Sequence, residues 1–252
     1  MFRVVVLAAI PAALLWAGDL ERARQFYQRT EYEAALQALG AEGSQDARVL
    51  LLAGQIYYQL GQYEDALERL ETASQLEPRS TEIFLWLGRS LGQRAKTASH
   101  FSLTETTALG YARRCQKALA RAVELDAKNV EAMSALASYY LEAPGFLGGD
   151  PGKAEKLAAQ IAALAPVKGQ YVQARMATWR KDFSRAEGHL QQVAEMAPDS
   201  PKLLFTQAEL YIQQKRNLEE ARALLRRYLQ MPLTPEDPPR WEAERLLKEA
   251  GG

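Results

Sequence analysis

The chain has 252 residues, of which 48% are hydrophobic, with 31 basic and 31 acidic side chains. This balance is ordinary for a globular protein and is enough to bury a core. The formal net charge of zero argues against nucleic-acid or lipid binding driven by bulk charge. Cys115 is the only cysteine, so no intramolecular disulfide can form and packing alone must stabilise the fold.

The N-terminus has the pattern of an export signal. Arg3 supplies a positive charge, and residues 4–17 form an uncharged apolar run. This run is shorter than the ~20 residues that a spanning helix needs, and it predicts a signal peptide of residues 1–17. We expect the mature chain to be exported, to the periplasm or beyond, without membrane insertion after cleavage. The alternative, that an uncleaved N-terminal segment anchors the chain, stays open.

A regular pattern is clearest in residues 47–80. Gly54, Ala66 and Pro78 follow one another at intervals of twelve residues. A small residue lets two helices approach closely, Gly61 suits the left-handed end of a helix, and Pro78 cannot continue one. One helix pair cannot bury its apolar face alone, so neighbouring pairs are expected to stack.

The same pattern recurs along the chain. Gly88 lies 34 residues after Gly54, and Pro198 lies 32 residues after Pro166. The pattern resembles the tetratricopeptide repeat (TPR), and it predicts an all-α TPR-type solenoid of about six helix pairs with a C-terminal capping helix. The predicted array spans 18–252, with repeats at about 18–46, 47–80, 81–129, 130–166, 167–200 and 201–234, and a capping helix at 239–250.

Two insertions interrupt the repeats. In the first, Ser102 and Glu105 read as a capping box, which predicts a long helix from about Leu103 to Asp126. Cys115 would be a small buried side chain on this helix.

The second insertion, residues 143–151, contains two adjacent glycines and predicts a helix cap at Asp150. We interpret it as a turn that tucks Phe146 and Leu147 against the array. An anion site at the helix start is the alternative, although the lysine and threonine of a phosphate loop are missing.

Motifs of catalysis are missing from the sequence. His100 and His189 are the only histidines, so no cluster of His and Cys has metal-ligand spacing. No nucleophile elbow, phosphate loop or dinucleotide fingerprint occurs. We therefore expect no enzymatic activity, no cofactor and no metal.

The TPR resemblance implies binding of a protein or peptide along the concave surface, which the first helix of each pair forms. Projecting the register onto that surface turns many side chains of the second to sixth repeats inward, among them Arg48, Gln55, Gln59, Glu82, Arg89, Glu131, Glu142 and Glu209. It also gathers three cations and three aromatic residues in the fifth and sixth repeats. These six are the predicted partner-binding residues: Lys168, Tyr171, Arg175, Trp179, Lys202 and Phe205. Cations beside exposed aromatics suit an acidic or amphipathic segment. Alternatively, Tyr171 and Trp179 pack between repeats.

The sequence thus predicts a protein-binding TPR scaffold or adaptor of the bacterial cell envelope. Residues 143–151 are similar to a stretch in exported bacterial repeat proteins of undefined role. They also resemble, more distantly, accessory components of tripartite ATP-independent periplasmic transporters. That likeness is limited to Gly-Gly-Asp followed by a helix, and no function is carried over from it. A substrate-handling periplasmic component associated with a transporter is the alternative function.

Overall fold

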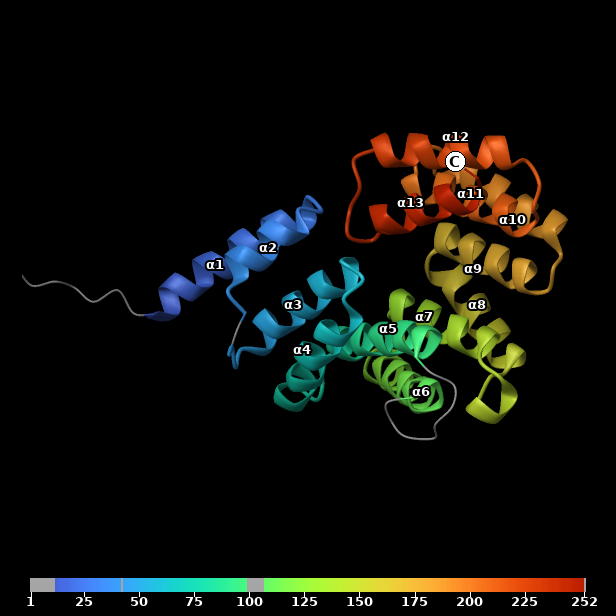
Figure 1. Cartoon of the computed structure of the whole chain (residues 1–252). Helices are drawn as coiled ribbons and strands as arrows, with labels where there is room; N and C mark the ends of the chain where they lie inside the picture. Colours follow the sequence, from blue (N-terminus) through green and yellow to red (C-terminus); the bar gives the residue numbers. More distant parts are fainter. Residues whose placement is uncertain (1–11, 42, 99–106, 252) are drawn as a thin grey trace, which may run out of the picture.

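A computed structural model describes residues 12–41, 43–98 and 107–251, with only the backbone described for residues 12–18. The described residues form thirteen α-helices and one 3-10 helix, with no strand among them (Figure 1). This confirms the predicted all-α fold. In the described part of the chain, every helix is too short or too polar to span a bilayer. The predicted cleavage point after Ala17 lies within the first helix, α1 (Ala12–Gln28).

The helices form six pairs followed by a single helix, α13 (Arg240–Glu249), which packs on the last pair. The pairs are α1 (Ala12–Gln28) with α2 (Tyr32–Leu39), α3 (Ala47–Gln59) with α4 (Tyr63–Leu76), α5 (Thr81–Thr97) with α6 (Ala108–Leu125), α7 (Val130–Glu142) with α8 (Pro151–Leu164), α9 (Pro166–Trp179) with α10 (Phe183–Met196), and α11 (Pro201–Gln213) with α12 (Leu218–Gln230). From α3 onward, each pair falls within one predicted repeat, except that α9 begins at Pro166, one residue before the predicted start at 167.

Small residues let the two helices of a pair cross closely. A Cβ on Gly54 of α3 would lie 2.5 Å from Cγ of Leu70 on α4, so only glycine fits this crossing. Gly61 ends the α3 region with a φ of +75°, in the left-handed region that favours glycine. Alanines of the second helices, such as Ala66 and Ala73, are fully buried, and their small side chains likewise allow close helix packing.

The first insertion differs from its prediction. The second helix of the third pair, α6, begins at Ala108, where the side chain of Thr107 accepts from the backbone N–H of Gly110 at 3.4 Å. The predicted start near Leu103 is therefore wrong, since Thr107 caps the helix in its place. The predicted capping box at Ser102 and Glu105 lies outside the described residues, as does His100.

The second insertion forms a 3-10 turn, Gly145–Leu147, and then α8. Asp150 is confirmed as a cap, because its side chain accepts from the backbone N–H of Lys153 at 3.1 Å. Leu147 is buried as expected, but Phe146 is 76% exposed. The expectation that both side chains tuck against the array was wrong for Phe146, because the 3-10 turn directs successive side chains to different sides.

The array curves until its two ends meet. Figure 1 shows the segment between α12 and α13 beside the end of α3. Gln59 donates from Nε2 to the carbonyl of Pro235 at 2.6 Å, and Trp241 donates from Nε1 to the carbonyl of Gln59 at 2.9 Å. The helices from α3 to α13 therefore form a closed ring, which the first pair, α1 and α2, precedes.

Candidate partner-binding surface

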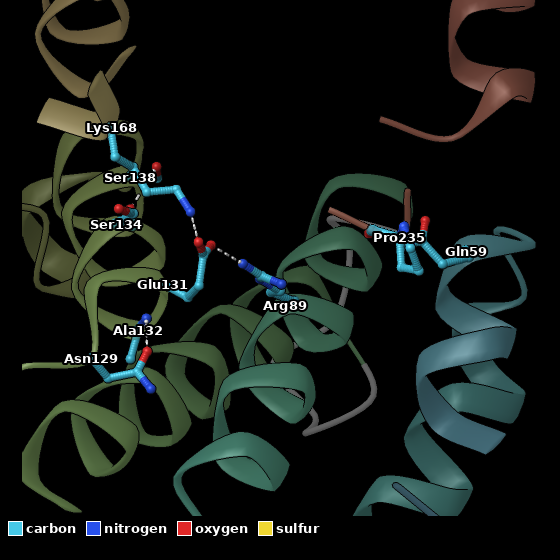
Figure 2. A network of polar contacts seen from close by, with 9 residues as sticks. All are labelled: Gln59, Arg89, Asn129, Glu131, Ala132, Ser134, Ser138, Lys168 and Pro235. Atoms are coloured by element: carbon cyan, nitrogen blue, oxygen red, sulfur yellow. Dashed lines mark hydrogen bonds and ion pairs between the residues drawn. The ribbon is translucent and has the colours of Figure 1, made fainter. Parts of the chain in front are cut away.

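Ion pairs connect successive first helices across the inner surface of the ring. Gln55 of α3 donates to Glu82 of α5 at 2.7 Å. Glu131 of α7 lies between two cations, Arg89 of α5 at 2.8 Å and Lys168 of α9 (Figure 2). The inward register predicted from the repeats therefore brings these side chains of neighbouring pairs together.

A second row runs parallel to the first. Glu142 of α7 pairs with Lys96 of α5 at 3.4 Å and with Arg175 of α9. Burial raises the pKa of Glu142, but the attraction of Arg175 and Lys96 outweighs it and holds that pKa below its ordinary value. The carboxylate is therefore ionised and neutralised from both sides at neutral pH.

The predicted cations of α9 are consequently not free. Lys168 pairs with Glu131, and Arg175 pairs with Glu142, although 54% of the Arg175 side chain remains exposed. Burial, together with neighbouring Lys202 and Arg89, lowers the pKa of Lys168 to about 8. Arg89, Lys168 and Lys202 belong to three different pairs but lie close enough to repel one another. They therefore face the same interior of the ring.

The inward face of α11 carries charges with fewer partners. Lys202 lies over the ring of Tyr171, 5.1 Å from its centroid, and forms no ion pair with any residue that the structure describes. Glu209 likewise makes no direct hydrogen bond or ion pair within the described ranges. Burial raises the pKa of Glu209, while more distant Arg175 and Lys96 lower it by less.

The three predicted aromatic residues have different surroundings. Tyr171 is partly buried, and its hydroxyl lies 3.0 Å from Oγ of Ser200. Trp179, at the end of α9, is 47% exposed. Phe205 is a correction: it is buried, with its ring centroid 5.5 Å from that of Tyr228, so it is core and not binding surface. Register alone placed Phe205 inward, but α12 and α13 cover it.

Contacts between distant repeats were missed at the level of sequence. Residues 235–238 lie between the last predicted repeat and the predicted capping helix, yet Pro235 is buried against Gln59 (Figure 2). Short-range patterns carry no signal for such a contact, because the two residues are separated by most of the array. The single sequence clue is the inward projection of Gln59.

Within the described residues, no group of three His, Cys, Asp or Glu side chains could hold a metal ion. Cys115 is buried, and burial raises the pKa of its thiol to about 12, so it is not an activated nucleophile. Burial and, to a smaller extent, the charge of Arg185 lower the pKa of His189. Its Nδ1 lies 2.7 Å from Oε1 of Gln170.

Comparison with known proteins gives two matches to repeat families. The family described as TPR repeat matches residues 54–93, and the family described as Tetratricopeptide repeat matches residues 180–241. No curated protein sequence matches the chain.

Solved structures with the same fold include three bacterial proteins. TTC0263 of Thermus thermophilus is 20% identical, with a TM-score of 0.65 over 78% of this chain and 98% of that one. A tetratricopeptide repeat protein of Parabacteroides merdae is 14% identical, with a TM-score of 0.53 over 95% of this chain and all (100%) of that one. The protein pilF of Pseudomonas aeruginosa is 20% identical, with a TM-score of 0.51 over 76% and 80% of the two chains. At these identities, the likeness is one of fold.

Proposed function

The chain is a tetratricopeptide-repeat protein, and from this premise we propose that it is a scaffold or adaptor of the bacterial cell envelope. Stacked helix pairs of this kind expose an extended concave surface, which such proteins use to bind other molecules. The partner is a protein or peptide that contacts the inner surface of the ring. The TPR fold is typically a non-catalytic scaffold for protein interaction, and the proposed role needs no catalysis.

The observation that carries this proposal is the set of under-partnered polar groups on α11. Within the described residues, Lys202 has the Tyr171 ring beside it and no ion pair, although the charges of Arg89, Arg175 and Asp237 act on it from farther away, and Glu209 has no direct partner. Burying charged groups without ion pairs is costly for a fold. A partner that pairs with them would remove this cost on binding, which favours recognition at this place.

Capture of partners from envelope extracts tests the proposal. The bait is the purified full chain, compared with the same chain carrying Lys202→Glu. We expect proteins retained by the wild type to be lost, because charge reversal beside Tyr171 repels the groups that Lys202 attracts. Retention should fall more than tenfold, which corresponds to a loss of about 1.4 kcal/mol.

Arg48→Glu provides the matched control. Arg48 is exposed, lies at the start of α3 and pairs only with nearby Asp46, 2.6 Å away. Its reversal should leave capture unchanged. A partner set that ignores Lys202→Glu, or that depends equally on Arg48, would place the binding surface elsewhere.

Envelope location is the second part of the proposal, and it is supported by the charged start and apolar run of residues 1–17. N-terminal sequencing of the protein from its native host should find Gly18 or a close neighbour as the first residue. Soluble cytoplasmic protein that retains Met1 would contradict export.

A further inference from the structure

The segment between α12 and α13, residues 231–239, is a proline-rich acidic turn. Its prolines are Pro232, Pro235, Pro238 and Pro239. The carboxylate of Asp237 accepts from the backbone N–H of Thr234 at 2.9 Å and from its hydroxyl at 3.0 Å, which fixes the turn. The hydroxyl of Tyr228 donates to the carbonyl of Pro238. These contacts hold the acidic turn through residues of the C-terminal part of the chain alone.

The acidic turn is seated on the second repeat. Pro235 is buried, and its carbonyl accepts from Nε2 of Gln59, which is itself buried. The indole of Trp241 donates to the carbonyl of Gln59, and its ring covers Gly61, 3.5 Å from where a Cβ would lie. We call this contact, of Gln59 and Gly61 with Pro235 and Trp241, the latch.

The latch has aromatic residues on its N-terminal side, and cations of α5 and α9 lie within electrostatic reach across the interior. Tyr27 and Tyr32 are buried with ring centroids 5.8 Å apart, and Glu236 lies near enough to act on both. Arg89 and Lys168, which both pair with Glu131 of α7, also lie within electrostatic reach of Glu236.

Glu236 does not complete this arrangement. Its side chain is exposed and makes no direct hydrogen bond or ion pair with any residue in the described part of the chain. The N-terminal side of the latch therefore attracts a carboxylate that the chain's own turn supplies only at a distance. A carboxylate of another molecule that lies closer to these cations would bind them more strongly than Glu236 does.

We propose that the N-terminal side of the latch is a docking site for an acidic, proline-containing segment of the partner protein, which displaces residues 231–241 and opens the ring. This inference rests on the proposed function, because it gives the chemistry of the partner and its point of entry to the inner surface. The latch consists of two hydrogen bonds and one ring contact at the array's ends. A segment that adds an ion pair to those contacts competes with it effectively.

A peptide with the sequence of residues 231–241, labelled with fluorescein, tests this directly. Fluorescence anisotropy measures its binding to the wild-type full chain and to the full chain carrying Trp241→Ala. This variant loses one latch hydrogen bond and the ring contact, but keeps Gln59. We expect the peptide to bind the variant at least tenfold more tightly than the wild type, whose site its own turn occupies.

Two further variants define the effect. Phe146→Ala removes an exposed aromatic side chain outside the latch and should bind the peptide as weakly as the wild type. Glu236→Lys in the full chain changes an exposed residue and repels Arg89 and Lys168. It should therefore bind the peptide more tightly than the wild type, as Trp241→Ala does. It keeps the test valid if Trp241→Ala folds poorly.

Substitutions in the full chain and in the peptide test whether the binding is specific. Adding Gln59→Ala to Trp241→Ala should abolish peptide binding, and a peptide carrying Glu236→Lys should bind at least tenfold more weakly. Equal affinity for wild type and Trp241→Ala, or no binding to either opened variant, would overturn the inference. So would light scattering that shows the opened variants pairing with a second copy of the chain. Capture that depends on Lys202 would survive all these outcomes, which separates this inference from the proposed function.

Discussion

Single residues on the inner surface differ in how well the fold satisfies their charge. Glu142 has two cationic partners and a lowered pKa, whereas Glu209 has none in direct contact within the described residues and a raised pKa. Both occupy inward positions on first helices, so the contrast reflects which cations their neighbours supply. The fold stabilises the first carboxylate and tolerates the second.

The raised pKa of Glu209 has a consequence for stability. Between the ordinary pKa of about 4.5 and the raised folded value, the native state binds more protons than the unfolded state, so stability falls as pH rises through this window. Above the window, the penalty is complete. Glu209→Gln should therefore raise the melting temperature at pH 7, and this gain should disappear near pH 4, where the wild-type carboxyl is protonated too.

Thermal melts followed by circular dichroism at the two pH values measure this difference. Glu195→Gln, at an exposed position on α10, is the control and should shift the melting temperature little at either pH. A loss of stability in Glu209→Gln at pH 7 would mean that Glu209 has a partner that holds it in place.

The repeat register predicted which way individual site residues face, but it did not predict which side chains they contact. Lys168, Arg175 and Lys202 do face one interior, as register required, but the glutamates that neutralise the first two lie on α7. Pairing of this kind depends on how far each pair rotates relative to the next, which the repeat pattern does not specify. Phe205 shows the same limit, because its burial depends on the later helices that cover it.

At the scale of elements, the turn before α8 relies on a close approach of two backbone segments. A Cβ on Gly149 would overlap the carbonyl oxygen of Ala143, which ends α7. Backbone atoms cannot move aside as a flexible side chain can. Gly149→Ala should therefore destabilise the protein by about 1–3 kcal/mol, in the range of overpacking changes, as measured by urea denaturation.

Gly145 in the same turn gives a matched control. A Cβ there would meet nothing within 4 Å, and its φ is not in the left-handed region. Gly145→Ala should leave stability within about 0.5 kcal/mol of the wild type, as expected for surface substitutions. An equal loss in both variants would show that backbone entropy and not contact at Gly149 governs the turn.

The elements themselves were largely predictable, because helix starts and stops have local causes. Asp150 caps α8 as its position before Pro151 indicated, and Gly61 ends α3 in the left-handed conformation. The start of α6 was mispredicted because the sequence analysis relied on Ser102 and Glu105 and overlooked Thr107. Thr107 caps the helix in the structure, and which of two local signals prevails depends on the packing of α6 against α5.

At the scale of the whole molecule, the stacking of pairs could be predicted and the meeting of the ends could not. Each pair packs on the next through residues that recur at repeat spacing, so the sequence contains that information many times over. Closure depends on small rotations that accumulate over six pairs, and on one contact between Gln59 and the segment 231–241. No repeated pattern encodes a contact that occurs once.

The latch also changes how the molecule unfolds locally. In a linear array, each terminal repeat has one neighbour and frays independently of the far end. Here the second repeat and the C-terminal cap are neighbours through Gln59 and Trp241, so loosening either end exposes the other. Hydrogen exchange at the amides of α2, α3 and α13 should therefore accelerate together in Trp241→Ala, although α2 and α3 lie at the opposite end of the sequence from the substitution. A molecule built from local units thus acquires a cooperativity that runs around its circumference as well as along its chain.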